Sequence, residues 1–220
     1  LRELGAEENA FTSDDYTAYY QVLASDRLSV AFELEADRLA SLRLPPEEFK
    51  REIEVIKEER RLRTEDNPSA KAYERFQALA FPASGYHTPT IGWMADLERM
   101  TVEELRAWYE TWYVPNNATL VVVGDVVPSE VHALAQRYFG SIAQRPLPQA
   151  QIPLELSTPG QRLLTLHLPT QLPSLMMGFN VPGLATSKNP REVHALRLIG
   201  ALHDGGYSAR LPSRLERGEE

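Results

Sequence analysis

The 220-residue sequence contains no cysteine. This absence excludes a disulfide framework, a catalytic thiolate and any zinc site built from cysteine ligands. It fits every cellular compartment and therefore favours none.

A positive charge excess and long apolar runs are also missing. The formal charge is −8 and the sequence pI is about 5.3. Phosphate binding needs a basic face, so this balance argues against a nucleic-acid partner. No run approaches the roughly 18 apolar residues of a membrane helix, so we predict no membrane span. The 43% hydrophobic and 25% charged residues are typical of a globular protein.

Complete catalytic motifs are absent as well. The sequence has no phosphate loop, dinucleotide fingerprint or Gly-x-Ser-x-Gly elbow, although a Ser-His-Asp arrangement stays open. None of the five histidines belongs to a His-Glu-x-x-His or His-x-x-Glu-His zinc motif. We expect them at surface or edge positions. They are His87, His132, His167, His194 and His203.

What the chain does contain is a charged, helix-forming run at 51–61 that carries Glu52 and Glu59. Seven residues at about 100° each return a helix to within about 20° of its start, so both carboxylates share one face. They stand about 10 Å apart along the axis, too far to ligate one ion together. The spacing favours one metal ligand and one supporting carboxylate, whereas a solvated face of ion pairs is the plainer interpretation.

The remaining pattern predicts an α+β fold. β-Branched, aromatic or continuous apolar runs predict strands at 9–12, 16–23, 118–124, 162–168 and 174–180. The 118–124 run is predicted to be buried on both faces. Helical periodicity and capping residues predict helices at 26–42, 47–64, 70–81, 101–113, 129–139 and 190–203. Glu35 falls within an apolar stripe, where we expect it to be paired rather than catalytic.

A Pro- and Gln-rich stretch predicts a boundary between two units. We expect a first domain at 1–150, a linker at 151–160 and the beginning of a second domain at 161–220. The order of elements in the second unit suggests two diverged copies of one design. The chain opens on Leu1 without an initiator Met and closes directly after a helical pattern, so we expect a fragment.

Four short motifs, in this order, resemble those of the insulinase/pitrilysin family of zinc metallopeptidases. The resemblance is strongest to its bacterial and mitochondrial-processing-peptidase-like branch and covers almost the whole chain. The motifs are Leu4-Gly5-Ala6-Glu7-Glu8-Asn9-Ala10-Phe11-Thr12, Glu52-x-x-Val55-Ile56-x-x-Glu59, Tyr113-x-Pro115-Asn116-Asn117-Ala118 with Val121-Val122-Val123-Gly124-Asp125, and Gly205-Gly206-Tyr207-Ser208-Ala209-Arg210-Leu211.

The resemblance implies a role for each matching residue. Glu59 corresponds to the third zinc ligand, and Glu52 to the acidic residue that supports it. Asn9, Ala10 and Phe11 correspond to the edge strand that pairs with an extended substrate peptide. The implied fold is a two-layer insulinase-like domain, a mixed sheet packed against helices, followed by the start of a similar second domain.

One departure from the family pattern is the missing His-x-x-Glu-His motif, which supplies the other two ligands and the general base. In the family it lies about 75–80 residues before the ligating glutamate. Only 58 residues precede Glu59 here, so the resemblance places the motif about 20 residues before Leu1. The family's Arg/Tyr substrate clamp is expected beyond Glu220.

Three functions therefore stay open. The first is a zinc metalloendopeptidase that hydrolyses peptides or unfolded protein segments, with this chain inactive by itself; Glu52 and Glu59 favour it. The second is a non-catalytic insulinase-like partner or structural subunit, and the third is a peptide-binding module using the 9–23 hairpin. The resemblance also implies a homo- or heterodimer with another insulinase-like subunit. The sequence does not identify the compartment, and the bacterial periplasm and the cytoplasm both stay open.

Overall fold

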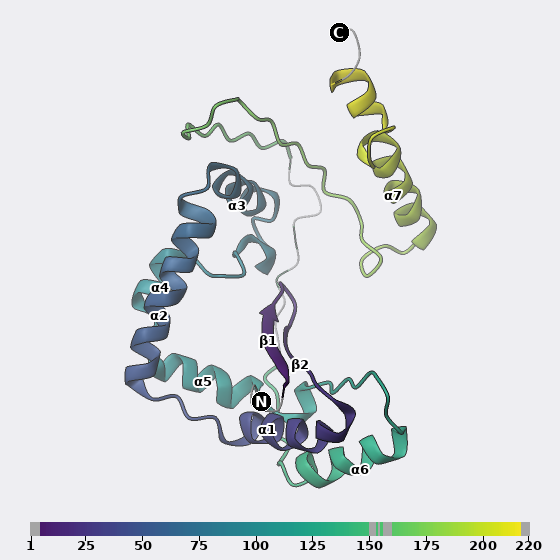
Figure 1. The fold of residues 1–220 in the computed structure, drawn as a ribbon. Coiled ribbons are helices and arrows are strands. Elements are labelled where there is room, and N and C mark those ends of the chain that lie inside the picture. The colour runs from purple at the N-terminus through teal and green to yellow at the C-terminus, as the bar shows by residue number, and fades with distance from the viewer. Residues whose placement is uncertain (1–4, 150–152, 154, 156–159, 217–220) are drawn as a thin grey trace. The chain divides into compact units, whose positions relative to one another are not determined.

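The computed structural model describes residues 5–149, 153, 155 and 160–216 (Figure 1). The contacts divide the chain into two units, Leu1–Gln171 and Leu172–Glu220. Most of the predicted linker at 151–160 lies outside the described residues.

The first unit begins with an antiparallel hairpin. Strand β1 (Glu7–Thr12) pairs with β2 (Thr17–Val22), with Asn9 opposite Tyr20 and Phe11 opposite Ala18. At the turn, the Ser13 amide donates to the Tyr16 carbonyl at 2.8 Å. Two of the predicted strands, at 9–12 and 16–23, are therefore confirmed.

Three helices follow the hairpin. A short 3-10 turn, Ser25–Arg27, leads into α1 (Leu28–Ser41), and α2 (Pro46–Arg60) continues into a π-helical turn, Arg61–Glu65. The third is α3 (Pro68–Ala80), where the Asn67 side chain accepts from the Ser69 and Ala70 amides. Proline in the first turn of α2 and α3 loses no helical hydrogen bond, which explains why both start there.

The rest of the first unit is also helical. A 3-10 turn, Gly85–His87, precedes α4 (Met94–Arg99) and α5 (Val102–Trp112); a 3-10 turn, Pro115–Asn117, precedes α6 (Pro128–Phe139). Helix α5 begins with a capping box: the Glu104 amide donates to Thr101 Oγ1 at 3.2 Å, and the Thr101 amide donates to Glu104 Oε2 at 2.8 Å. The hydrogen bonds that the Glu104 carboxylate accepts from the Thr101 amide and the Thr101 hydroxyl lower the pKa of Glu104.

Small clusters of apolar side chains hold these helices together. Helix α1 packs on α6, where the rings of Phe32 and Phe139 meet edge to face at 5.9 Å. Ile53 of α2 and Leu97 of α4 are buried, and Val114 is fully buried. Burial of side chains such as these supplies the main favourable free energy of the unit.

The second unit is built around α7 (Pro190–Asp204), which the Asn189 side chain caps by accepting from the Arg191 amide. The helix ends at Gly205, where a Cβ atom would lie 2.4 Å from the Ala201 carbonyl oxygen. A π-helical turn, Pro212–Glu216, follows.

The α+β class is confirmed, but the expected mixed sheet is not observed. Within the described residues the sheet has two antiparallel strands, and the predicted strands at 118–124, 162–168 and 174–180 have no ladder partners. The run at 118–124 is also not buried: Val121 is 74% and Val123 91% exposed. An apolar run specifies an extended backbone, but a strand also requires a neighbouring strand to complete its hydrogen bonds.

No helix in the described part of the chain is both long enough and apolar enough to cross a membrane.

Candidate functional site

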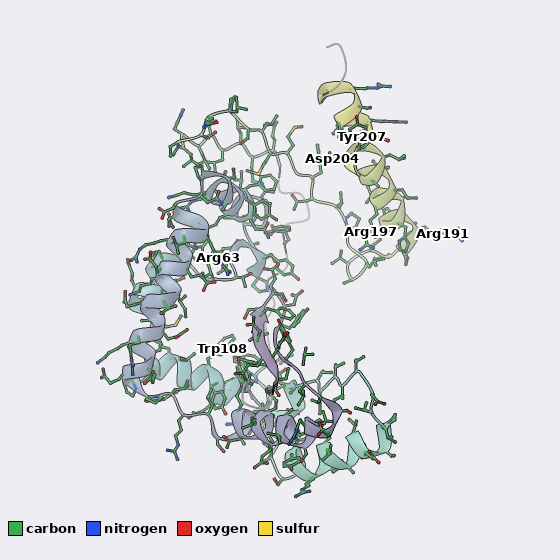
Figure 2. All side chains as sticks on the ribbon, viewed as in Figure 1. Arg63, Trp108, Arg191, Arg197, Asp204 and Tyr207 are labelled. Carbon is green, nitrogen blue, oxygen red and sulfur yellow. The ribbon has the colours of Figure 1, made fainter. Side chains whose placement is uncertain are left out.

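Glu59 lies in the last turn of α2, just before the π-helical turn. Its carboxylate forms an ion pair with Arg63 Nη1 at 2.8 Å, and the Glu59 and Arg63 side chains are 39% and 75% exposed. Arg63 is labelled in Figure 2. Surface ion pairs of this kind contribute about 0–1 kcal/mol. Breaking this ion pair, so that the Glu59 carboxylate could bind a metal ion instead of Arg63, would therefore cost little free energy.

Glu52 lies on the same helix and is exposed. Its acidic neighbours are engaged in local ion pairs: Glu48 with Arg51, Glu54 with Lys57, and Glu58 with Arg61. Among the described ion pairs, none involves Glu52. Glu52 thus stands apart from the local ion pairs on the helix surface, whereas Glu59 forms one with Arg63, four positions further along the chain.

Directly after Glu59, Arg60 anchors this end of α2. Arg60 is 2% and Glu74 8% exposed. Arg60 donates to both carboxylate oxygens of Glu74, at 2.8 and 3.1 Å, and also to the Gly92 carbonyl at 2.8 Å. A bidentate pair fixes orientation as well as distance, so the backbone beside Glu59 is held in place.

The charged side chains around Arg60 shift the pKa of Arg60 and that of Glu65. Burial by itself lowers the pKa of Arg60, but hydrogen bonds and charge from Glu74 and Glu65 outweigh it and raise the pKa. The hydrogen bond from Lys71 to Glu65, 2.6 Å long, is the main reason why the pKa of Glu65 is lowered. The raised pKa of Arg60 and the lowered pKa of Glu65 both favour the charged forms of these two side chains.

Our sequence reasoning did not identify the Arg60–Glu74 pair. A usable signal was present, because Arg60 follows Ile53 by seven positions and so lies on the inward stripe of α2. A charged residue on such a stripe requires a buried partner. Its partner, 14 positions further along, could not be chosen from periodicity.

The candidate peptide-binding strand is β1. Asn9, Ala10 and Phe11 are all exposed. One edge of β1 pairs with β2, and no strand within the described residues covers the other edge. An open edge presents backbone donors and acceptors to an extended peptide.

A complete zinc site is not formed by the described residues, among which no group of three or more His, Asp or Glu side chains could hold a metal ion. Zinc in proteins usually needs three or four protein ligands, and Glu59 supplies one carboxylate. His87 is engaged locally, with Nδ1 2.6 Å from the Ser84 carbonyl oxygen. The part of the chain that the structure describes therefore does not supply a full zinc centre by itself.

Zinc titration of the isolated 220-residue chain should accordingly show no tight 1:1 complex. One carboxylate without further ligands cannot repay the dehydration of the ion. Isothermal titration calorimetry with a zinc buffer measures this directly. Stoichiometric binding with submicromolar affinity would mean that a histidine of this chain completes the site.

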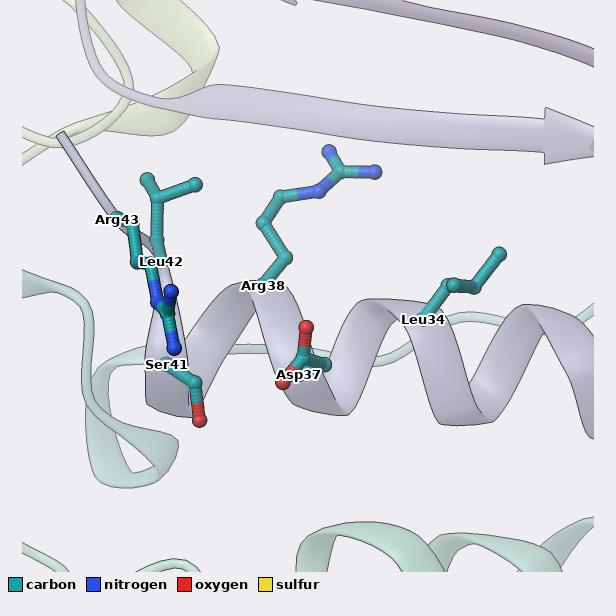
Figure 3. Close-up of a pocket in the computed structure, with 6 residues that line it drawn as sticks. All are labelled: Leu34, Asp37, Arg38, Ser41, Leu42 and Arg43. Atoms are coloured by element: carbon teal, nitrogen blue, oxygen red, sulfur yellow. The ribbon is translucent and has the colours of Figure 1, made fainter. Parts of the chain in front are cut away.

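A shallow hollow of about 470 Å³ lies beside the C-terminal half of α1 (Figure 3). It is lined by Leu34, Asp37, Arg38, Ser41, Leu42 and Arg43. Arg38 pairs with Glu35 at 2.5 Å and lies over the Tyr19 ring at 4.5 Å. The pairing expected for Glu35 is thus confirmed, and none of the candidate site residues lines this hollow.

Two family models together match most of the chain. The model for insulinase (peptidase family M16) matches residues 1–90, and the model for the peptidase M16 inactive domain matches residues 99–219. The candidate residues at 9–11, 52 and 59 all lie within the first match.

Curated relatives are bacterial zinc proteases by name. The chain is 32% identical to the zinc protease PqqE of Helicobacter pylori, over 98% of this chain and 48% of the relative. An uncharacterized zinc protease of Mycobacterium leprae is 29% identical over 94% of this chain and 46% of its own length. The chain thus spans about half the length of the curated relatives it matches.

Solved structures agree with this fold. A crystal structure of a Helicobacter pylori protease superposes with a TM-score of 0.64 and 34% identity, over 70% of this chain and 37% of that one. An M16-like peptidase from Alicyclobacillus acidocaldarius superposes with a TM-score of 0.60 and 23% identity, over 70% of this chain and 36% of that one. The second similarity supports the fold alone.

Proposed function

Since this chain belongs to the insulinase family, peptidase family M16, we propose that it is part of a zinc-dependent metalloendopeptidase. Its substrates would be peptides or unfolded protein segments. The observation that carries the proposal is Glu59 itself, a carboxylate on an anchored helix end, held only by an exposed arginine, in a chain similar to zinc proteases.

In this proposal Glu59 gives one carboxylate to zinc, and Glu52 supports it from the same helix. The remaining ligands and the general base belong to the part of the protein that this chain does not cover, since the relatives are about twice as long. No catalytic step is assigned to the present residues alone.

In this proposal, β1 binds the substrate peptide. An extended peptide would add to the open edge beside Asn9, Ala10 and Phe11 through backbone hydrogen bonds. Such pairing depends little on side chains, which suits an enzyme that accepts peptides or unfolded segments. Exposed Phe11, in edge contact with Tyr16 at 5.7 Å, offers an apolar surface for a substrate side chain.

The proposed organisation places most of an N-terminal insulinase-like domain at 1–150 and the beginning of a second at 161–220, with a linker between them. The family models, which match 1–90 and 99–219, support two successive family segments without fixing this boundary.

The alternative is a non-catalytic insulinase-like subunit that acts beside an active partner, as a homo- or heterodimer. The match of residues 99–219 to the model of the inactive domain is compatible with both functions, because relatives named zinc proteases align over the same residues. In the non-catalytic subunit the open edge of β1 would still bind peptide, but Glu59 would be an ordinary surface charge.

Metal content and cleavage of the full-length protein distinguish the two. The peptidase should contain about one zinc per chain, cleave an unfolded protein, lose cleavage on chelation and regain it with added zinc. Mass spectrometry of metals and of cleavage products measures both. A protein that binds the unfolded substrate but neither holds zinc nor cleaves would support the non-catalytic subunit instead.

A further inference from the structure

Two hydrogen bonds fix the tip of the β1–β2 hairpin. Asp15 Oδ1 accepts from the Tyr86 hydroxyl at 2.9 Å, and Asp14 Oδ1 accepts from the Thr90 hydroxyl at 3.2 Å. The partners are 71 and 76 positions apart in the sequence. The hairpin that carries the candidate peptide-binding edge is therefore held by the segment 81–93.

The same segment is held at its other end by the residue that follows Glu59. The Gly92 carbonyl accepts from Arg60 at 2.8 Å, and the Arg60 guanidinium lies over the Trp93 ring at 5.9 Å. Gly92 has φ +84°, so a side chain there would be strained. This backbone geometry presents its carbonyl to the buried arginine.

The segment also has hydrogen bonds among its own residues. Ser84 caps the 3-10 turn by accepting from the Tyr86 amide at 3.3 Å, and the Gly92 amide donates to the Pro89 carbonyl at 2.7 Å. The rings of Phe81 and Tyr86 meet edge to face at 6.0 Å. The segment is thus held by contacts among its own residues as well as by its contacts with the hairpin and with Arg60.

We propose that residues 81–93, here called the brace segment, fix the spacing between the peptide-binding strand β1 and Glu59. The brace segment joins Asp14 and Asp15 at one end to Arg60 at the other. This proposal rests on the proposed peptidase function. Its physical basis is that a substrate carbonyl displaced by about 1 Å from its reactive position can react about 100-fold more slowly.

The test removes the two hydroxyls that join the brace segment to the hairpin. In the full-length, zinc-loaded enzyme, Tyr86→Phe with Thr90→Val keeps the ring and side-chain volume but loses both hydrogen bonds. We expect kcat to fall about 10-fold with KM within about 2-fold, because the peptide still pairs with β1 but is misplaced relative to the metal. Zinc content should not change, and the thermal midpoint should fall only slightly, because the net contribution of two exposed hydrogen bonds to stability is small.

A matched control is Tyr73→Phe with Thr88→Val, which removes two hydroxyls for which the described residues show no hydrogen bond. This control should leave kcat, KM and zinc content unchanged. As a second variant, Asp15→Ala should lower kcat, and combining it with Tyr86→Phe should cost no more than the larger single change, because both remove one interaction.

Unchanged kcat in the double hydroxyl variant would overturn the proposal. A loss of kcat that is matched by a lower folded fraction, or that is simply additive with Asp15→Ala, would overturn it too. A wild-type protein that cleaves nothing and holds no zinc is a different result: it rejects the peptidase itself and, with it, any catalytic role of the brace segment.

Discussion

Glu59→Gln in the full-length protein is expected to lower zinc affinity and kcat/KM by more than about 100-fold, beyond the 10–100-fold typical of residues around a metal ligand. Glutamine keeps the size of the side chain but replaces a charged oxygen donor with a weaker neutral one. The fold should be unaffected, because the carboxylate contributes only an exposed ion pair with Arg63. Metal analysis after dialysis and steady-state kinetics measure the effect.

The matched control is the adjacent residue. Glu58→Gln also removes an exposed ion pair, with Arg61 at 2.9 Å, from the same helix turn. It should leave zinc content and kcat/KM within a factor of about two, since it removes no proposed ligand. If the two variants had the same zinc content and the same kcat/KM, Glu59 would not be a zinc ligand.

Glu74→Gln is expected to lower the unfolding free energy by about 3 kcal/mol, more than the substitutions at Glu58 or Glu59. The substitution leaves the buried Arg60 guanidinium without its bidentate partner, with only Glu65 and the Gly92 carbonyl remaining. Urea denaturation of the metal-free full-length protein, followed by tryptophan fluorescence, measures it, since Trp93 lies beside Arg60.

Here too Glu58→Gln is the appropriate comparison, because the Glu58 side chain is 58% exposed. It should change the unfolding free energy by less than about 0.5 kcal/mol. If Glu74→Gln were equally mild, the Arg60 cluster would contribute no more than a surface pair, and the anchoring of α2 would need another explanation.

Local signals predicted the longer helices but not the six-residue α4. Thr101 and Glu104 form a capping box at the start of α5, and prolines lie in the first turns of α2 and α3. These signals act within one or two helical turns, so they can be read from neighbouring residues. The hairpin could also be predicted from neighbouring residues, because its two strands are separated by a short polar turn at Ser13.

Features that depend on partners distant in the sequence could not be predicted from neighbouring residues. The run at 118–124 was predicted to be a buried strand, but pairing is decided by segments elsewhere in the fold. Likewise, Arg60 finds the Gly92 carbonyl 32 positions away. For the site, helical spacing placed Glu52 and Glu59 on one face, while their proposed roles came from the family resemblance.

The exposed run at 118–123 has a practical consequence. It is uncharged and includes Leu120 and three consecutive valines. Segments of this composition, when their backbone is unpaired, are templates for intermolecular β-sheet and fibril growth. Recombinant production of this chain alone should therefore favour inclusion bodies, and a charged substitution at the 91% exposed Val123 is a rational first step towards a sample that stays dispersed.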